Sequence, residues 1–528
     1  MPFVKVRPAR DKTSKDFRNS NISQKEELKN DLTCTPLGNE NIINKLNCQE
    51  KEILKSSTNS VNVESLWKEF RENTTMHGLK HARRENKYQL RWVIWIIALF
   101  GMGSLLVYTV YTLFAYYRTN PTLTNINLKF VREMFYPAVT ICNMSPYKLS
   151  AVNASAVMMS HLLHSSRLGV VLPPLDYTNP ANAELNDSLS EDWLDNVSFD
   201  LDDMFMYCVN ERHVIACKNI LKAKVTQWGK CFTYNANENL PQEGRVKGSM
   251  TGSATALTFY IDVKQNEYVF NTNMAAGVKI ILHDPEEEPD VNNKGFISSP
   301  GMSTYVSMKM TKYKYLPAPY KAGGDQFCLD TKAPGFQNTL KYQQFYSRTG
   351  CQLECRRDFI VNQCGCRAVT DPGNETLCSP IQAATCYYQN EVEFDSNAEL
   401  KEQCKCQISC EFTTFDQSIS TSTSPADVYF PILQSMGYTD IKNNILEVRL
   451  YYDSLSYLLV ESIPEYNTED IVGILGGQMG IFLGASLLTL SELIEFVILS
   501  VAMVMKKCYR CAFRKKNEQN EQDLSQYY

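Results

Sequence analysis

Two acidic residues, Glu492 and Glu495, are the only charges inside the longest apolar stretch of the sequence, residues 471–505. Carboxylates are costly within a membrane, where they usually line a water-filled path, and their charge attracts cations. Mostly small or polar residues recur there at steps of three and four, on one helix face: Gly473, Gly477, Gly480, Gly484, Leu488, Ser491 and Glu495. We interpret this face as the lining of a cation pore. A helix-packing seam is the alternative, because GxxxG pairs fall within the stretch.

The stretch is longer than a simple membrane anchor requires. As one helix it would measure about 50 Å against roughly 30 Å of hydrocarbon, so part of it must project, tilt or break. A second apolar run, residues 92–116, has the length of one spanning helix, with tyrosines gathered at its outer end. Basic residues precede the first run and follow the second, which predicts cytosolic termini and an extracellular middle at the plasma membrane.

The sequence therefore predicts five segments. They are a cytosolic N-terminus (1–90), transmembrane helix 1 (91–117), an extracellular domain (118–470), transmembrane helix 2 with the pore (471–505) and a cytosolic C-terminus (506–528). Within the first segment, residues 64–72 are predicted to form a short amphipathic helix.

The extracellular segment contains most of the cysteines. Of the 18 in the chain, only Cys34, Cys48, Cys508 and Cys511 lie outside it, which predicts a disulfide framework in an oxidising compartment. Cysteine spacing alone leaves the pairing open. N-x-S/T sequons in this segment are candidate glycosylation sites: Asn143, Asn153, Asn186, Asn196 and Asn374.

Alternating hydrophobicity in the extracellular segment predicts strands, and two stretches look helical. The strands are expected at residues 256–263, 277–282, 304–310 and 446–452, and the helices at residues 200–207 and 344–364. We expect a mixed sheet with helices at its edge. The cysteines between Cys328 and Cys410 mark a helical subdomain stapled by disulfides.

Nothing in the sequence predicts catalysis. His161 and His164 form an HxxH pair, but no HExxH, GxSxG, Walker loop or zinc-ligand set accompanies them. We therefore expect no enzyme activity, no metal site and no cofactor. The chain carries 53 Lys+Arg against 58 Asp+Glu, and we expect no nucleic-acid partner. The CxxC of Cys508 and Cys511 is either reversibly acylated or a pair of inert thiols.

Several motifs occur together in one order. His77-Gly78 precedes the first apolar run, YPAVTICN (residues 136–143) follows it, the cysteine-rich middle comes next, and GGQMGIFLGAS (residues 476–486) lies in the second run. In this order and topology the chain resembles the degenerin/epithelial sodium channel superfamily over nearly its whole length after the N-terminal tail.

The resemblance implies an α+β membrane protein, with two transmembrane helices flanking a large disulfide-rich mixed α/β ectodomain. That ectodomain is likened to a hand with palm, knuckle, finger and thumb. The resemblance further implies a homotrimer in the lipid bilayer around a sodium-selective pore that amiloride blocks. Na⁺ would be the permeant ion.

The resemblance also assigns roles in the pore. Gly484, Ala485 and Ser486 would be the selectivity filter where the second span unwinds, and small side chains there let backbone carbonyls reach a partly dehydrated ion. Glu492 and Glu495 would form the ring of pore carboxylates below the filter. The gate would lie at Gly473, Gly477 and Gly480. The re-entrant loop would include His77 and Gly78.

In the ectodomain the resemblance implies a disulfide pairing and a coupling contact. The pairs are Cys142–Cys231, Cys208–Cys217, Cys328–Cys410, Cys351–Cys406, Cys355–Cys404, Cys364–Cys386 and Cys366–Cys378. Tyr320 would couple the thumb to the first span, with Tyr116 or Tyr117 as its partner.

Proton-gated relatives use clustered carboxylates between finger and thumb, and this chain departs from that pattern. In register with those clusters stand Val269, Phe270 and Asn271 and then residues 387–392, with only Glu391 and Glu393 acidic near the second patch. Since like-charged pairs are what raise carboxylate pKa values, the departure argues against proton gating.

An acidic run with interleaved aromatics, residues 191–205, suits a cationic, aromatic peptide. Its candidate ligand-binding residues are Trp193, Phe199, Asp200, Asp202, Asp203 and Phe205. The chain as a whole, including GVKIILHDPEEEP (residues 277–289) and LPAPY (residues 316–320), most resembles the FMRFamide-activated sodium channels, and we predict a channel opened by an extracellular amidated peptide. A solvated acidic helix is the other interpretation of the run. Other hypotheses are a proton- or bile-acid-gated member, an ATP-gated type of trimeric channel, and a membrane-anchored receptor without a pore.

Overall fold

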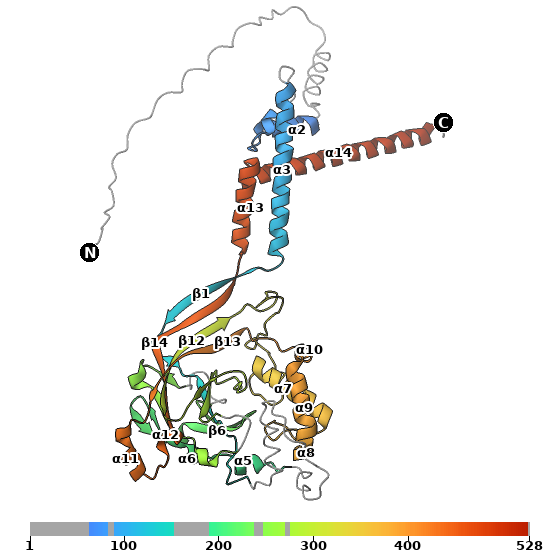
Figure 1. Cartoon of the computed structure of the whole chain (residues 1–528). Coiled ribbons are helices and arrows are strands. Elements are labelled where there is room, and N and C mark those ends of the chain that lie inside the picture. The colour runs from blue at the N-terminus through green and yellow to red at the C-terminus, as the bar shows by residue number, and fades with distance from the viewer. Residues whose placement is uncertain (1–62, 83–88, 153–188, 237–245, 270–274, 526–528) are drawn as a thin grey trace, which may run out of the picture. The chain divides into compact units, whose positions relative to one another are not determined.

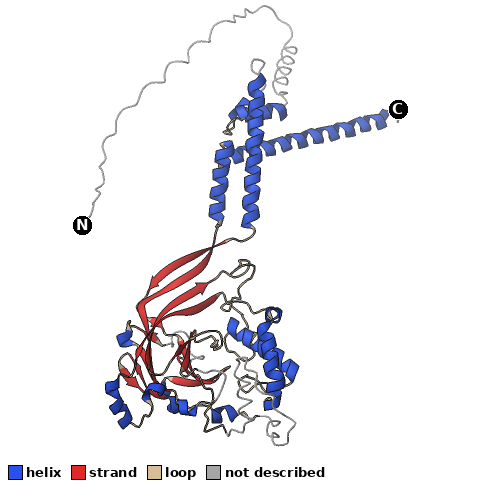
Figure 2. Ribbon diagram, viewed as in Figure 1, coloured by secondary structure: helices blue, strands red, loops and turns tan. Residues whose placement is uncertain are grey.

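The central part of the chain is built on β-sheets, and helices lie around them (Figures 1 and 2). The structure, a computed structural model, describes residues 63–82, 89–152, 189–236, 246–269 and 275–525. The chain folds as two units. The central unit is Phe100–Phe482, and the terminal unit is formed by the residues up to Leu99 together with those from Leu483 onward.

The largest sheet of the central unit is mixed. Its strands run in the order β13 (Glu411–Thr423), β12 (Met302–Lys314), β14 (Ile445–Pro464), β9 (Leu257–Asp262), β4 (Phe205–Asn210) and β5 (His213–Ile215), with β1 (Thr122–Phe130) also on β14. Strands β12 and β14 are parallel, and the other pairs are antiparallel. This confirms the mixed sheet and three of the four strands predicted from alternating hydrophobicity, and the fourth, predicted at residues 277–282, is β10 (Val278–His283) of the second sheet.

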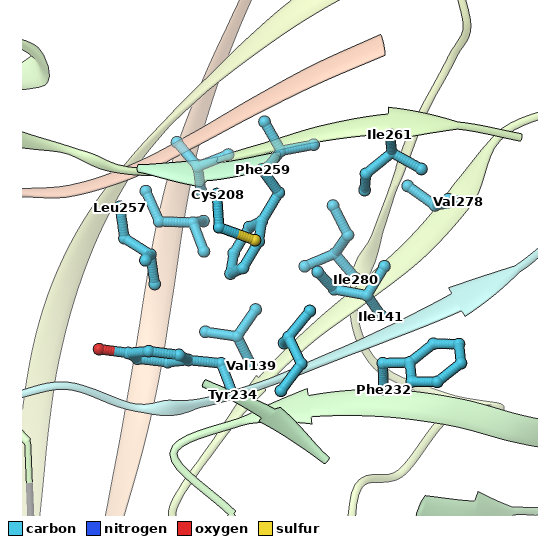
Figure 3. Packing of buried hydrophobic residues seen from close by; sticks show 14 of the residues in the cluster. Val139, Ile141, Cys208, Phe232, Tyr234, Leu257, Phe259, Ile261, Val278 and Ile280 are labelled. Carbon is cyan, nitrogen blue, oxygen red and sulfur yellow. The ribbon is translucent and has the colours of Figure 1, made fainter. Parts of the chain in front are cut away.

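A second sheet packs against the first. It runs β11 (Phe296–Ser298), β10 (Val278–His283), β3 (Ala138–Asn143), β7 (Gly229–Tyr234) and β6 (Leu221–Thr226), and β2 (Met134–Phe135) pairs separately with β8 (Lys247–Gly248). Figure 3 shows the core between the two sheets, where Phe259 and Ile261 of β9 face Val139 and Ile141 of β3. These four side chains are fully buried, and β3 is buried on both of its faces, which explains why YPAVTICN is mostly apolar.

Short helices fill the connections of the central unit. They are α5 (Trp193–Val197), α6 (Leu201–Met204), η3 (Cys217–Asn219), η5 (Ser253–Thr255), η6 (Gln265–Glu267), η8 (Asp427–Tyr429), α11 (Phe430–Ser435) and α12 (Ile441–Asn444). The predicted helix at residues 200–207 is wrong beyond Met204. Phe205 and Cys208 pair with Ile261 and Phe259 of β9 instead, and this strand pairing buries both side chains in the core.

The cysteine-rich stretch forms a helical subdomain on one side of the sheets (Figure 1). Its elements are α7 (Arg348–Cys364), α8 (Pro380–Gln382), the π-helical η7 (Ala383–Tyr387), α9 (Tyr388–Ser396) and α10 (Ala398–Gln403). Helix α7 begins where the hydroxyl of Ser347 accepts the N–H of Gly350. Residues 344–347 of the helix predicted for 344–364 are therefore outside it.

Seven disulfides join the central unit, and they are the seven pairs that the family resemblance implies. Four staple the helical subdomain, at Cys351–Cys406, Cys355–Cys404, Cys364–Cys386 and Cys366–Cys378. Cys328–Cys410 joins its base to the large sheet, Cys142–Cys231 links β3 to β7, and Cys208–Cys217 closes a short loop. Closing loops as long as these reduces the entropy of the unfolded chain.

The long helices carry the apolar runs. They are α3 (Gln89–Tyr117), α13 (Thr468–Leu483) and α14 (Leu487–Ser525), and Leu90–Tyr117 and Leu488–Tyr509 are long and apolar enough to cross a membrane. Many of their large apolar side chains are exposed, including Ile97, Val107 and Ile498. In the terminal unit, α2 (Val63–Asn73) confirms the predicted amphipathic helix, and η1 (Leu79–His81) follows it.

A buried ion pair fixes the helical subdomain internally. Nη1 of Arg356 on α7 lies 3.1 Å from Oε1 of Glu391 on α9, and the side chains are 8% and 3% exposed. A charge buried this deeply is stabilised by its ion-pair partner, because few water molecules can reach the charge and replace that partner. Glu391, one of the two acidic residues near the second patch, is therefore committed to Arg356.

We expect Glu391→Gln to lower the free energy of unfolding by roughly 3 kcal/mol, because the buried Arg356 guanidinium loses its closest carboxylate and keeps only weaker interactions with Asp371 and Asp395. The loss of stability is measured by heating the detergent-solubilised protein and determining the folded fraction at each temperature by size-exclusion chromatography. Glu393→Gln, at an exposed position two residues along α9, is the matched control. Equal melting temperatures for the two variants would contradict the role given to the pair.

Candidate functional site

The second apolar run breaks at the three residues of its Gly-Ala-Ser motif. Helix α13 ends at Leu483, α14 begins at Leu487, and Gly484, Ala485 and Ser486 between them are not helical. Gly484 adopts the left-handed φ of +60°, and a Cβ there would overlap the imidazole of His77. This confirms the unwinding that the resemblance implied at these three residues, and it divides the helix face expected from residue 473 to residue 495 into two parts.

Polar side chains cap the start of α14. The N–H of Ser486 donates to Oγ1 of Thr489 at 3.0 Å, the N–H of Thr489 reaches Oγ of Ser486 at 3.4 Å, and the N–H of Leu490 bonds the carbonyl of Ser486 at 3.1 Å. These bonds satisfy N–H groups that the first turn of a helix leaves without partners. The break is thus a built feature of the sequence, with Ser486 as the N-cap.

The His-Gly motif packs against this break. The backbone N–H of His77 donates to the carbonyl of Leu483 at 3.1 Å. Gly78 has a left-handed φ of +85°, and a Cβ there would come within 3.3 Å of Trp95 and Leu99 on α3. The His-Gly and Gly-Ala-Ser motifs are about 400 residues apart in the sequence, and no sequence pattern relates them. In the structure they meet at Gly484.

The two glutamates of the run have different environments. Oε2 of Glu492 accepts Oγ1 of Thr74 at 3.0 Å and the N–H of Thr75 at 3.2 Å, whereas Glu495 is exposed. Gly473, Gly477 and Gly480 all lie within α13, in the central unit, and a Cβ on any of them would meet nothing of this chain within 4 Å. These glycine positions therefore have space for a neighbouring helix.

The predicted coupling contact differs from what the structure shows. The Tyr116 hydroxyl donates to Oε2 of Glu465 at 2.8 Å, and its ring lies edge-on to Tyr466, with centroids 6.1 Å apart. Tyr320 lies in a turn closed onto Pro317 and makes no ring contact with Tyr116 or Tyr117 within the described part of the chain. Residues 465–466 are thus the partners of Tyr116, which sequence motifs did not reveal.

The acidic run is largely neutralised by pairing, and its aromatics point inward. Phe199 and Phe205 are 3% and 6% exposed in the main core, so the prediction that these two anchor a ligand is wrong, whereas Trp193 packs on Tyr147 and is only partly buried. Phe205 is buried because it belongs to β4, which pairs with β9 in the large sheet. The ion pairs are Glu191 with Arg367, Asp195 and Asp200 with Lys230, and Asp203 with Lys148. Asp202 is exposed.

The sequons have different outcomes. Asn143 is only 5% exposed and its Nδ2 donates to the carbonyl of Val263, so the prediction of a glycan there is wrong for the folded chain. Asn196 and Asn374 are exposed and remain candidates. Asn153 and Asn186 lie outside the described residues, as do His161, His164, Phe270 and Asn271.

A cavity of about 440 Å³ adjoins the acidic run, and sequence reasoning found only one of its walls. Glu191, Leu194 and Asp195 form that wall. The other walls come from β6 and its turn, from α7 and from the loop after Cys366, and include Gln227, Arg356 and Arg367. No periodicity or motif joins these segments, so only the tertiary structure could bring them together.

Comparison with known proteins places the chain in a family. Residues 70–496 match the family described as the amiloride-sensitive sodium channel. Acid-sensing ion channel 1A of Danio rerio is 26% identical over 475 residues, which cover 84% of this chain and 90% of that protein. Acid-sensing ion channel 4 of Rattus norvegicus is 29% identical, covering 81% and 78%. The solved structure of a proton-activated chloride channel shares 8% identity over 78% of this chain and 97% of that chain, at a TM-score of 0.29 that carries no weight for the fold.

The chain belongs to the amiloride-sensitive sodium channel family, and the degenerin/epithelial sodium channel resemblance is confirmed. It is a cation channel of the plasma membrane with two spans, it passes Na⁺ without a cofactor, and it is not an enzyme. Members of the family are trimeric and blocked by amiloride. The hypotheses of an ATP-gated type of channel and of a receptor without a pore are therefore wrong.

We expect Gly484→Ala to abolish current while the protein still reaches the cell surface. A left-handed φ costs a non-glycine residue about 1–2 kcal/mol, and the added Cβ would also displace His77. Adding His77→Ala should remove the overlap and restore part of the current, recorded under voltage clamp alongside surface biotinylation. Gly101→Ala on α3, where a Cβ meets nothing within 4 Å, is the control. Normal current from Gly484→Ala alone would refute this account of the break.

Proposed function

We propose that this chain forms a homotrimeric, sodium-selective, amiloride-sensitive channel opened by an extracellular amidated peptide of the FMRFamide type. The observation that carries the pore assignment is the non-helical Gly484–Ala485–Ser486 between α13 and α14 in a chain of this family. A helix that ends inside the membrane leaves its last carbonyls without intrahelical partners, and such carbonyls coordinate cations.

The same segment supplies the other parts that conduction requires. Small side chains at Gly484, Ala485 and Ser486 allow three copies to approach closely enough for a partly dehydrated ion to touch backbone oxygens. Carboxylates below the constriction would concentrate cations there. Gly473, Gly477 and Gly480 would allow the three α13 helices to pack closely as a gate, because each has open space where a Cβ would be.

The cavity beside the acidic run is the proposed agonist site. Its volume of about 440 Å³ is in the range of small-ligand pockets. Its wall includes the Asp195 carboxylate, which pairs with Lys230 but is 69% exposed, so it would also accept a cationic side chain of a ligand. Two of its lining residues carry buried donors that have no hydrogen-bond acceptor among the described residues, Nε of Arg356 and Nε2 of Gln227. A peptide, with a cationic group and several carbonyl oxygens, matches both features.

The position of the cavity suggests how binding would act. Its walls come from the acidic run, from β6 with its turn and from the helical subdomain, so a ligand touching all three would bind one arrangement of them better than another. A ligand moves an open–closed equilibrium only by this difference in affinity. We propose that the arrangement favoured by the agonist separates the outer ends of the second spans.

Proton gating is the second candidate, and one cluster favours it. Burial, and next the neighbouring Asp284 carboxylate, raise the pKa of Glu287 to about 7. Glu287 lines a cavity of about 280 Å³, whose other titratable residues are Tyr136, Asp284, Glu286, Lys312, Tyr313, Lys314, Lys332, Tyr346 and Glu411. Burial lowers the pKa of the adjacent His283 to about 4, so that imidazole stays neutral in the same range. The matched relatives named acid-sensing channels lend this candidate further support.

The agonist site is tested with amidated peptides, acid and bile acids applied to cells that express the chain. For a peptide that evokes amiloride-blocked current, we expect Asp195→Asn to raise the half-maximal concentration about tenfold, or about 1.4 kcal/mol. Asp200→Asn is the matched control, because Asp200 shares Lys230 with Asp195 but does not line the cavity. Equal shifts for the two variants would mean general charge steering, and current evoked by acid alone would favour the second candidate.

The proton candidate predicts a pH dependence of stability. A carboxyl with a folded pKa near 7 and an ordinary unfolded pKa binds its proton more tightly in the folded state. The stability contributed by Glu287 is therefore fully present below the unfolded pKa and is lost as pH rises through about 7. Glu287→Gln should flatten the melting temperature between mildly acidic and mildly alkaline pH and shift the pH of half-maximal acid-evoked current. Glu286→Gln, on the same loop, should change both quantities much less, because the Glu286 carboxylate is the smallest of the causes that shift the pKa of Glu287.

A further inference from the structure

One face of α14 contacts the segment that precedes the first span. Thr489, Glu492 and Phe496 recur along it at steps of three and four, so they lie on one side of the helix. Phe496 packs on the rings of Trp67 and Phe70 of α2, with centroids 5.5 and 4.9 Å away. The contact therefore extends along α14 from the cap at Ser486 to Phe496.

The Glu492 carboxylate is occupied within this contact. Oε2 accepts two hydrogen bonds, from the Thr74 hydroxyl at 3.0 Å and the Thr75 N–H at 3.2 Å, and Oε1 lies 3.5 Å from the Thr75 hydroxyl. An ionised acceptor makes stronger hydrogen bonds than a neutral one. Glu492 is thus tied to the residues just before the His-Gly motif.

The same threonines connect Glu492 to the break in the second span. The hydroxyls of Thr75 and Thr489 are 2.6 Å apart, and Thr489 accepts the N–H of Ser486 at 3.0 Å. Thr74 and Thr489 are each 2% exposed. We call Thr74, Thr75 and Thr489 the threonine clamp. On the other side of the break, His77 bonds the Leu483 carbonyl, so the segment supports both ends of the Gly-Ala-Ser motif.

Glu495 has none of these contacts. It lies three residues after Glu492, about 60° away around the helix. It is exposed, and it has no hydrogen-bond partner among the residues that the structure describes. A carboxylate in this state keeps its lone pairs available for a passing cation.

We propose that the two glutamates have separate tasks: Glu492 is a positioning residue that holds the threonine clamp against the selectivity filter, and Glu495 is the carboxylate that meets permeating cations. This inference deepens the proposed function and rests on its assignment of Gly484–Ser486 as the filter. Removing the hydrogen bonds of Glu492 would therefore alter selectivity although no residue of the filter is substituted.

Variants that separate charge from hydrogen bonding test the assignment in current recordings. Gln at position 492 can still accept from Thr74 and Thr75, whereas Ala cannot. We expect Glu492→Gln to keep the reversal potential in sodium-outside, potassium-inside solutions, and Glu492→Ala and Thr75→Val to shift it toward zero. Combining the last two should shift it no further, because they break one contact. For Glu495, Gln and Ala should both lower the single-channel conductance equally.

A crosslink tests the contact without requiring current. In a full-length background with Cys34, Cys48, Cys508 and Cys511 changed to Ser, Thr75→Cys and Thr489→Cys are introduced together. A protease site is placed in the turn after α3, before the first disulfide cysteine, Cys142. After oxidation and cleavage, we expect the N-terminal fragment to stay attached to its own chain on a non-reducing gel and to be released by reductant. Thr75→Cys with Ser491→Cys, on an exposed part of α14, is the control that should release it.

The two experiments distinguish failure of the clamp from failure of the proposed function. Three results would each overturn the inference, even if sodium currents are normal. They are release of the fragment from the variant that combines Thr75→Cys with Thr489→Cys, attachment of the fragment to a different chain, and a full loss of selectivity with Glu492→Gln. Attachment to its own chain in a protein that passes no sodium current would support the contact and refute the filter assignment.

Discussion

The organisation of this channel depends on one constraint: inside a membrane, every backbone N–H and C=O must find a partner in the protein or on an ion. The second span breaks at Gly484, Ala485 and Ser486, so backbone groups at both helix ends lose intrahelical bonds. Ser486 and Thr489 satisfy N–H groups on one side, and the His77 N–H takes the Leu483 carbonyl on the other. In the filter that we propose, the carbonyls that remain would coordinate a partly dehydrated sodium ion.

The chain satisfies this constraint with a segment remote in sequence. Helix α2 and the residues after it lie before the first span, yet their hydrogen bonds and aromatic contacts go to the start of α14. His77 takes the space that a side chain on Gly484 would need, and Gly78 closes its turn against Trp95 and Leu99. The His-Gly and Gly-Ala-Ser motifs are therefore one structural unit, and the requirement for glycine at positions 78 and 484 has the same origin.

The central unit consists of rigid blocks with a cavity between them. The core between the two sheets is closely packed, and four disulfides hold the helical subdomain as one block. The cavity lies between such blocks, where Glu191 and Asp195 face residues of α7 and of the β6 turn. Since the blocks themselves deform little, binding energy there would mainly change how they are placed against one another. This is why we assign the agonist to the cavity rather than to the buried Phe199 and Phe205.

The sequence by itself determined the two apolar spans, the family, the disulfide-rich ectodomain, four of its strands and the motif at which the second span breaks. These depend on local properties of the sequence. They are the length of an apolar run, a hydrophobic period of two residues in strands or of three to four in helices, and the left-handed backbone that glycine allows. Only the tertiary structure decided that Phe205 starts a core strand, that Asn143 is buried, that Tyr116 meets Glu465, and that Glu492 is bonded while Glu495 is exposed. Each of these depends on which distant segment lies opposite the residue, and spacing along one chain carries no record of that pairing.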